Sequence, residues 1–293
     1  MFSSALIANR GEIAVRIART CADMGIRAVA VYAPEDRDAM HVRVADAAFA
    51  LSGQSIAETY LNPKAIVDTA IKAGAEAIHP GYGFLAESAA LAQAASEAGL
   101  IWVGPPPEAL ELVSNKLSAR ALAARAAVQM VPASEGPVSS VAEIAGFGSA
   151  HGYPLVIKAC YGGGGRGMRV VRSADQIAEA LAACSREAEA AFGRGECFVE
   201  RFLERPRHVE TQCLADAHGT VAVVSTRDCT VQRRHQKLIE EAPAPFLTDA
   251  QDDQLRRASR ALLTEAGYRG AATCEFLVSS AGEVFFMEIN PRL

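Results

Sequence analysis

The chain has 293 residues, half of them hydrophobic, and a formal net charge of −5 at pH 7. This length can bury more than one hydrophobic core, so we expect several domains. The mild acidity and the lack of like-charge blocks disfavour general nucleic-acid binding. No uncharged apolar run reaches the roughly 18 residues of a membrane span, and the N-terminus lacks the apolar core of a signal peptide. We therefore expect a cytoplasmic protein that binds neither membranes nor nucleic acids.

The first 112 residues alternate short apolar runs with helical patterns. The expected strands are 5–8, 28–31, 77–78 and 100–103, and the expected helices are 12–24, 63–72 and 87–98. This order predicts an open, mainly parallel α/β sheet with ligand-binding loops at the strand ends. The first strand is followed by Asn9-Arg10-Gly11-Glu12 and not by Gly-x-Gly-x-x-Gly, which disfavours a nicotinamide or flavin cofactor.

A rigid turn is predicted at residues 79–87, where a proline and two glycines present His79, Tyr82 and Glu87. Taken alone, this turn is more simply structural than functional. The seven cysteines are scattered and lack a close Cys-x-x-Cys pair, so we interpret them as reduced, buried thiols.

A glycine-rich segment, Lys158 to Met168, is the most informative stretch of the chain. It joins an apolar strand at 154–157 to a second strand at 169–172, so its glycines lie in a hairpin. Glycine backbone N–H groups can turn toward phosphate oxygens, and Lys158 supplies a point charge. A flexible surface hairpin is the alternative. Lys116, in the preceding Ala-rich helix, is either a solvated lysine or a second phosphate contact.

A second unit is expected from about residue 131, with a helix at 174–191 and a strand at 197–200. The exit of that strand, Glu200-Arg-Phe-Leu203, has two interpretations. It is either an ordinary strand-to-loop exit or an extended edge that presents N–H and C=O groups to a planar heterocycle such as adenine.

A third unit begins with strands at 208–214 and 220–226 and continues into a run rich in cationic and amide side chains. The run gathers Gln232, Arg233, Arg234, His235 and Lys237 ahead of two glutamates. Such a concentration of donors favours an anion site over a solvated face.

Three possible metal ligands follow on two further strands, at 271–278 and 283–290, after a helix at 249–266. Glu288 and Asn290 are two apart on a strand and share a face, and antiparallel pairing brings Glu275 near them. Two carboxylates and an amide oxygen in an apolar sheet would repel without a hard cation between them, which indicates magnesium or manganese. Exposed acids on an edge strand are the alternative.

Six ordered segments, taken together, resemble biotin carboxylase, the ATP-grasp enzyme or domain of biotin-dependent acyl-CoA and pyruvate carboxylases. These segments are 7–13, 79–85, 158–168, 233–237, 240–245 and 288–293. The resemblance implies an N-terminal pre-ATP-grasp domain at 1–112 and an incomplete α+β ATP-grasp fold. Its small lobe is expected at 113–203 and the start of its large lobe at 204–293. Because the family continues past position 293, with a Gln-Val-Glu-His segment and a C-terminal domain, the resemblance implies a truncated chain, and it leaves the independent activity of that chain open.

Carried over position by position, the resemblance implies a set of nucleotide-binding residues. The ATP phosphates are expected at Lys116, Lys158, Gly164 and Gly165. The adenine is expected at Glu200, Arg201, Phe202 and Leu203. Further contacts to the nucleotide are expected from His208, Gln232, His235, Glu275 and Glu288.

The resemblance also implies metal-binding, catalytic and interface residues. Two Mg²⁺ or Mn²⁺ ions are expected at Glu275, Glu288 and Asn290. Lys237 and Arg292 match bicarbonate-binding catalytic residues, with Arg292 as the catalytic arginine. Arg19 and Asp23 match an ion pair between the subunits of family homodimers.

The implied reaction is ATP-dependent carboxylation of biotin on a biotin carboxyl carrier domain or protein. Bicarbonate and ATP give carboxyphosphate, and a carboxyltransferase component uses the carboxybiotin. Two alternatives remain, a non-catalytic nucleotide-binding regulatory protein and another ATP-grasp ligase of the carbamoyl-phosphate synthetase type. The His79 turn and the run at 233–237 argue against the second alternative.

Overall fold

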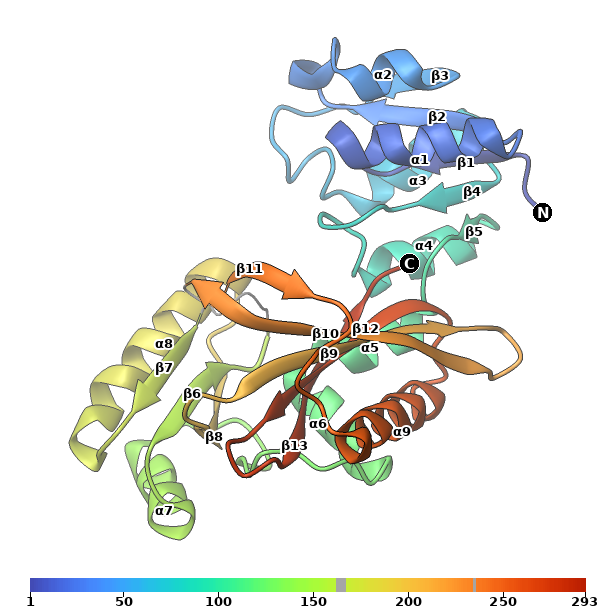
Figure 1. The fold of residues 1–293 in the computed structure, drawn as a ribbon. Helices are drawn as coiled ribbons and strands as arrows, with labels where there is room; N and C mark the ends of the chain where they lie inside the picture. The colour runs from blue at the N-terminus through green and yellow to red at the C-terminus, as the bar shows by residue number, and fades with distance from the viewer. Residues whose placement is uncertain (162–166, 234–235) are drawn as a thin grey trace. The chain divides into compact units, whose positions relative to one another are not determined.

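The computed structural model describes the chain except for residues 162–166 and 234–235. It contains two compact units, and the colours of Figure 1 follow the chain through them. Unit 1 comprises Met1–Glu111, Tyr268–Ala271 and Pro291–Leu293. Unit 2 comprises Leu112–Gly267 and Ala272–Asn290.

Unit 1 is built on a parallel five-stranded sheet with the order β3-β2-β1-β4-β5. Its strands are β1 (Ser4–Ile7), β2 (Arg27–Tyr32), β3 (Ala47–Ala50), β4 (Ala77–His79) and β5 (Ile101–Trp102). Its helices are α1 (Gly11–Asp23), α2 (Met40–Val44), α3 (Pro63–Lys72) and α4 (Ala89–Glu97), with a 3-10 turn at Pro34–Asp36. The parallel α/β sheet predicted from the sequence is confirmed. Two short elements, β3 and α2, were not predicted.

Alternating side chains on β1 serve two hydrophobic cores. Ile7 packs with Ile17 of α1, whereas Leu6 packs with Ile66 of α3 and Leu91 of α4. Successive residues of a strand face opposite sides, so the sheet is covered on both faces, with α1 on one and α3 and α4 on the other (Figure 1). The central strand β1 is therefore apolar at every position after Ser4.

The N-terminal part of unit 2 contains a three-stranded antiparallel sheet with the order β7-β6-β8. Its strands are β6 (Leu155–Ala159), β7 (Met168–Val171) and β8 (Cys197–Arg201). The helices are α5 (Pro107–Ser114), which leads in from unit 1, α6 (Lys116–Arg125), α7 (Val141–His151) and α8 (Ile177–Phe192), with a 3-10 turn at Ala174–Gln176. Val171, Ile177 and Cys184 belong to one core that joins α8 to this sheet.

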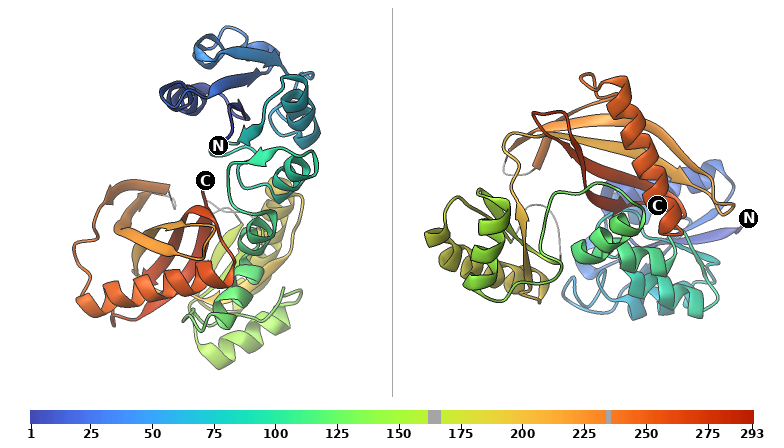
Figure 2. Two further views of the ribbon diagram at one scale, coloured as in Figure 1. Left: turned by 90° about the vertical axis from the view of Figure 1, so that its right-hand side faces the viewer. Right: turned by 90° about the horizontal axis from the view of Figure 1, so that it is seen from below.

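The C-terminal part of unit 2 is a five-stranded sheet with the order β11-β10-β9-β12-β13. Its strands are β9 (Arg207–Ala215), β10 (Val221–Arg233), β11 (Gln236–Glu241), β12 (Gly270–Val278) and β13 (Val284–Pro291). Helix α9 (Asp249–Glu265) begins with a Thr248–Gln251 capping box and buries Leu255 and Leu262. Figure 2 shows α9 running along one face of this sheet.

The remaining general features concern membranes and thiols. In the parts of the chain that the structure describes, no helix has the length and apolar character needed to cross a membrane. All seven cysteines are buried, free thiols, as the sequence predicted.

Candidate functional site

Three residues of unit 2, Lys158, Glu200 and Arg120, form a group that we call the Glu200 cluster. Lys158 on β6 lies opposite Phe198 of β8, two residues before Glu200, so Lys158 and Glu200 share a face of the sheet. Lys158 Nζ donates to Glu200 Oε1, and Arg120 Nη1 of α6 donates to Glu200 Oε2 at 3.2 Å. Glu200 is 8% exposed. One buried carboxylate therefore faces two permanent cations.

The predicted adenine edge continues from Glu200. The backbone N–H of Arg201 donates to Pro132 O at 2.9 Å, and that of Phe202 donates to Pro154 O at 3.0 Å. Phe202 and Leu203 are half-buried. Because the N–H groups of Arg201 and Phe202 already have partners, neither is available to a heterocycle in this arrangement.

Within unit 2, Lys116 contacts both the end of the small sheet and the large sheet. Its backbone N–H donates to Cys160 O at 3.1 Å, and its neighbour Asn115 forms a bridge with Tyr161. Lys116 therefore lies beside the start of the glycine-rich segment. Its Nζ is 3.2 Å from Glu288 Oε2 on β13. Gly164, Gly165 and His235, also predicted at the nucleotide, lie outside the described residues.

A second group, which we call the Glu275 cluster, comprises Glu275, Glu210, Lys237, His208 and Asn290. Glu275 Oε1 accepts from Lys237 Nζ at 3.0 Å and from Asn290 Nδ2 at 2.7 Å. Lys237 also donates to Glu210 Oε2. His208 Nε2 lies 2.6 Å from Glu275 Oε2. Strands β9, β11, β12 and β13 thus each contribute to one buried polar network.

The protonation states in the Glu275 cluster follow from these contacts. Burial alone would raise the pKa of Glu275, but the hydrogen bond from His208 and the charge of Lys237 lower it to about 2. Burial would lower the pKa of Lys237, yet Glu210 and Glu275 raise it above its ordinary value. The lysine and Glu275 are therefore charged at neutral pH.

Gln232 orients the imidazole of this cluster. Its Nε2 donates to His208 Nδ1 at 2.7 Å and to Cys229 O at 2.7 Å. This contact at Nδ1 turns the other ring nitrogen, Nε2, toward Glu275. Gln232, predicted as a nucleotide contact, thus orients the side chain of another predicted contact.

The carboxylates among the predicted metal ligands have cationic partners that the sequence did not indicate. That argument left Glu275 and Glu288 uncompensated without a cation, whereas Lys237 and His208 compensate Glu275 and Lys116 pairs with Glu288. The strand pattern did not reveal these partners because they come from other elements.

The donor set nevertheless fits a hard divalent ion. Asn290 lies against Glu275, and a 180° turn of its amide would present the oxygen in place of Nδ2. Two carboxylates and an amide oxygen are ligands that Mg²⁺ accepts. Among the described residues, Glu210, Cys229 and Glu240 form another group with ligand atoms within 4.8 Å of one another. Lys237 and Arg227 already pair with Glu210, which disfavours an ion there.

Arg292, the predicted catalytic arginine, lies in unit 1. Its Nη1 is 3.9 Å from Glu87 Oε1, and its backbone N–H donates to Ala271 O at 3.0 Å. The ion pair with Glu87 was not predicted, although Glu87 ends the turn that the sequence singled out.

The turn at His79 is held by hydrogen bonds from Asn9, a residue of another segment. Asn9 Nδ2 donates to Pro80 O and Tyr82 O, both at 2.7 Å. Gly81 has φ +67°, and a Cβ there would lie 2.9 Å from Asn9 Nδ2, so glycine is required. Burial lowers the pKa of His79 to about 4, and its Nδ1 accepts from the Gly81 N–H. This histidine is therefore neutral at pH 7.

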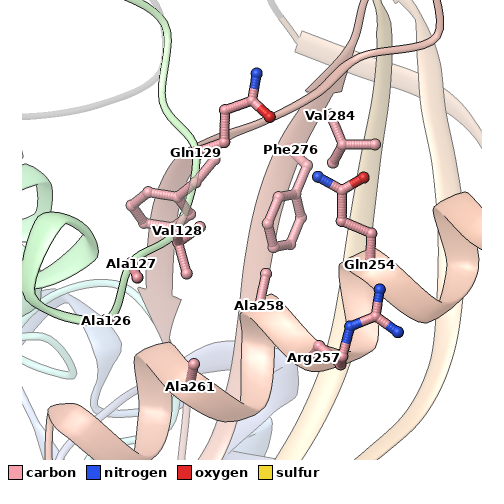
Figure 3. A pocket seen from close by; sticks show the side chains of 11 residues that line it. Ala126, Ala127, Val128, Gln129, Gln254, Arg257, Ala258, Ala261, Phe276 and Val284 are labelled. Carbon is pink, nitrogen blue, oxygen red and sulfur yellow. The ribbon is translucent and has the colours of Figure 1, made fainter.

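A cavity of about 320 Å³ lies on the α9 side of the large sheet (Figure 3). Phe276 forms part of its wall, with Ala258 of α9 opposite. Phe276 follows Glu275 on β12, and consecutive strand residues face opposite sides. The cavity is therefore behind the Glu275 cluster and separate from it.

Sequence reasoning missed three residues of the site, Arg120, Glu210 and Arg227. Arg120 follows Lys116 by four positions on α6, so helical spacing could have placed both on one face. Glu210 follows His208 by two positions on β9, so strand alternation could have placed it beside that histidine. Arg227 pairs with Glu210 through the β9–β10 register, which gave no local signal.

The arrangement of the two sheets of unit 2 is that of an ATP-grasp protein. The small antiparallel sheet carries Lys158, and on the large sheet Glu275 contacts Lys237. Comparison with protein families divides the chain close to the boundary between the two units. Residues 1–110 match the biotin carboxylase N-terminal domain, and residues 115–293 match the carbamoyl-phosphate synthase L chain ATP-binding domain. The chain therefore belongs to the family of carbamoyl-phosphate synthase L chain ATP-binding domains, preceded by a biotin carboxylase N-terminal domain.

The relatives confirm the resemblance to biotin carboxylase. The chain is 54% identical to the biotin-dependent acyl-coenzyme A carboxylase alpha3 subunit of Mycobacterium leprae, over 98% of this chain and 48% of that protein. It is 46% identical to the biotin carboxylase of Haemophilus influenzae, over 100% of this chain and 65% of that protein.

A solved structure shares both the sequence and the fold. The biotin carboxylase domain dimer of Hydrogenobacter thermophilus 2-oxoglutarate carboxylase, in complex with MgADP, ADP and bicarbonate, superposes with a TM-score of 0.95. The two chains are 41% identical, and the match covers 100% of this chain and 64% of that one. The chain thus spans about half to two thirds of the length of these relatives.

Proposed function

We propose that this chain binds MgATP and takes part in the ATP-dependent carboxylation of biotin with bicarbonate. The contact of 3.2 Å between Lys116 and Glu288 carries the proposal. It sets a predicted phosphate-binding lysine against a predicted metal-binding carboxylate, within the unit that holds both charged clusters. The identity with the H. influenzae biotin carboxylase supports the same reaction class.

The nucleotide is bound, in this proposal, by both parts of unit 2. The excess positive charge of the Glu200 cluster attracts the phosphates, and Lys158 and Lys116 contact them with the Gly164 and Gly165 amides. The adenine lies along residues 200–203 and contacts the half-buried side chains of Phe202 and Leu203, because the N–H groups of Arg201 and Phe202 are already bonded within the chain. His208, Gln232 and His235 contact the nucleotide from the large sheet.

Glu275, Glu288 and Asn290 would hold two Mg²⁺ or Mn²⁺ ions. When bound, these ions supply positive charge that offsets the charge of the triphosphate. Lys237, a fixed cation beside Glu275 in unit 2, and Arg292 in unit 1 are each proposed as bicarbonate contacts. The chain's own part in this chemistry is to hold the anions close together.

In the proposed reaction, a bicarbonate oxygen attacks the γ-phosphorus of ATP, and ADP leaves, giving carboxyphosphate. Carboxyphosphate breaks down to CO₂ and phosphate, the phosphate accepts the proton of the biotin ureido N–H, and that nitrogen attacks the carbon of CO₂. Arg292 stabilises the negative charge that develops on the ureido oxygen, as a permanently charged donor. Fixed cations of this kind need no proton transfer of their own during the reaction.

The proposal includes partners and domain limits. We assign 1–112 to the pre-ATP-grasp domain, 113–203 to the small lobe and 204–293 to the start of the large lobe. Biotin would arrive on a carrier domain or protein, and a carboxyltransferase component would use the product in the cytoplasm. Arg19 and Asp23 are exposed on α1, as a contact with a second subunit requires, and the Hydrogenobacter domain is a dimer.

A second candidate is a ligase of the carbamoyl-phosphate synthetase type, because residues 115–293 match that family's ATP-binding domain. The match of residues 1–110 to the biotin carboxylase N-terminal domain favours the first candidate.

The test combines calorimetry with turnover. MgATP should bind to the purified chain, and binding should require the divalent ion. ADP release that rises with both bicarbonate and free biotin supports the carboxylase. ADP release that rises with ammonia and bicarbonate, without biotin, supports the second candidate. A chain that does not bind MgATP contradicts both.

A further inference from the structure

Arg120 is a half-buried cation to which the proposed reaction gives no task. Its side chain is 17% exposed, and it lies one helical turn after Lys116 on α6. Its Nη1 donates to Glu200 Oε2 at 3.2 Å, and its Nη2 donates to Val131 O at 2.7 Å. The guanidinium therefore links the helix, the segment after it and strand β8.

Glu200 is shared between two cations that use different oxygens. Lys158 contacts Oε1 and Arg120 contacts Oε2. A carboxylate this deeply buried is costly unless a cation or several donors compensate it. If Lys158 turned toward a phosphate, Oε1 would lose its cation while the contact of Oε2 with Arg120 could persist.

The surrounding backbone holds Arg120 and Glu200 in fixed relation. Arg120 is anchored to Val131 O, Arg201 N–H donates to Pro132 O, and Ala133 forms a bridge with Glu200. The segment 131–133 thus runs beside the end of β8 and binds Arg120 as well. Lys158 has no comparable planar fork, and its single ammonium group can change partners by rotation of its side chain.

We propose that Arg120 is a positioning residue for nucleotide binding, which keeps Glu200 compensated so that Lys158 can leave it for a phosphate. Arg120 itself touches neither the nucleotide nor a reacting atom. The inference rests on the proposed ATP-binding function. Without Arg120, phosphate binding by Lys158 strips a buried carboxylate of its last cation, and affinity falls.

The test is calorimetric titration with MgADP of Arg120→Met, Arg120→Lys, Glu200→Gln and the double variant Arg120→Met/Glu200→Gln. Arg120→Met should weaken MgADP binding about tenfold, and Arg120→Lys should restore most of the loss. In the Glu200→Gln background the same Arg120→Met change should have little effect, because no buried carboxylate remains for Arg120 to compensate. Adenosine, which lacks phosphates, should bind Arg120→Met and the parent chain equally.

Arg125→Met is the matched control, since Arg125 lies on the same helix and pairs with Glu265 at its exposed face. It should leave MgADP affinity unchanged. Equal losses from Arg120→Met with and without Glu200, or an equal loss of adenosine binding, would mean that Arg120 only maintains the fold and would overturn the proposal. If Arg120→Met does not fold, Arg120→Gln keeps a donor for Val131 O and takes its place in the same cycle.

The outcomes separate this proposal from the one on which it rests. If the parent chain does not bind MgADP, both fall. If it binds MgADP but the two substitutions are additive, the nucleotide site stands and the role of Arg120 is wrong.

Discussion

The Glu200 cluster and the Glu275 cluster use the same kinds of side chains with different charge balances. In the first, Lys158 and Arg120 face one carboxylate. In the second, the two carboxylates Glu210 and Glu275 face Lys237, and Glu210 also pairs with the adjoining Arg227 of β10. The Glu200 cluster has more cations than carboxylates and can bind an anion directly. In the Glu275 cluster, with Arg227, the charges are balanced, so an anion binds there only together with a cation. One ligand that satisfies both is a polyphosphate carrying divalent ions.

The largest loss of stability should come from removing Lys237, because this lysine pairs with both carboxylates of the Glu275 cluster. Lys237→Met leaves Glu275 and Glu210 without their shared lysine, and we expect a loss of about 3–5 kcal/mol in the free energy of unfolding. Arg120→Met should cost less, because Lys158 still compensates Glu200. Urea denaturation of both variants tests the difference.

Lys64→Met is the control for these denaturation experiments. Lys64 pairs with Asp68 on the surface, and its side chain is 83% exposed, so the change should cost less than about 1 kcal/mol. If Lys237→Met is as mild as Lys64→Met, the charge balance inferred for the Glu275 cluster is wrong.

The second-largest effect should come from acid, which protonates Glu275 and removes the stabilisation that its ionised form provides. Its contacts lower the pKa of Glu275 from 4.5 to about 2, so the folded state favours the ionised carboxylate. The resulting stability is fully present above pH 4.5 and is lost as the pH falls toward 2. The difference corresponds to about 3 kcal/mol.

The pKa of Glu275 can be measured directly by NMR titration of its carboxyl carbon. The free energy of unfolding should also fall less steeply between pH 4.5 and 2 in Glu275→Gln than in the parent chain. A carboxyl that titrates near 4.5 would contradict the network drawn around it.

The comparison also shows how far the sequence alone could reach. Lys158 and Glu200 were both singled out because each lies on a strand of clear apolar character, but their contact depends on the pairing of β6 with β8, which are separated in the chain by β7 and α8. The pairing of Lys237 with Glu275 depends on the order β11-β10-β9-β12-β13, in which β9 and β12 are neighbours despite their separation in the chain. No local pattern contains that order.

Two misses have a different physical origin. The strand β3 (Ala47–Ala50) is short and alanine-rich, so it carries little of the branched apolar signal that marks a buried strand. The compensation of Glu288 by Lys116 spans 172 positions of sequence. Both residues were predicted to bind the same ligand, yet their direct contact without it could be seen only in the structure.

Lys158 tests the cationic side of the comparison. Lys158→Ala removes a charge-assisted contact to phosphate of roughly 1.5–3 kcal/mol, so MgATP should bind about 10- to 150-fold more weakly. The magnesium concentration that supports half-maximal binding should stay the same, since the metal ligands are intact. Calorimetry at several magnesium concentrations measures both quantities. Unchanged affinity would remove Lys158 from the nucleotide site.

Glu288 tests the metal-binding side, with the smallest effect. Glu288→Gln keeps an oxygen ligand but loses its charge, so half-maximal nucleotide binding should need about fivefold more magnesium, about 1 kcal/mol. Metal-free ADP should bind no more weakly, because the substitution removes the negative charge that Glu288 places 3.2 Å from Lys116 Nζ. Glu283→Gln, at the exposed end of the same hairpin, is the control. Identical magnesium titrations for Glu288→Gln and the parent chain would show that Glu288 serves only to hold Lys116, and the metal site would then rest on the Glu275 cluster alone.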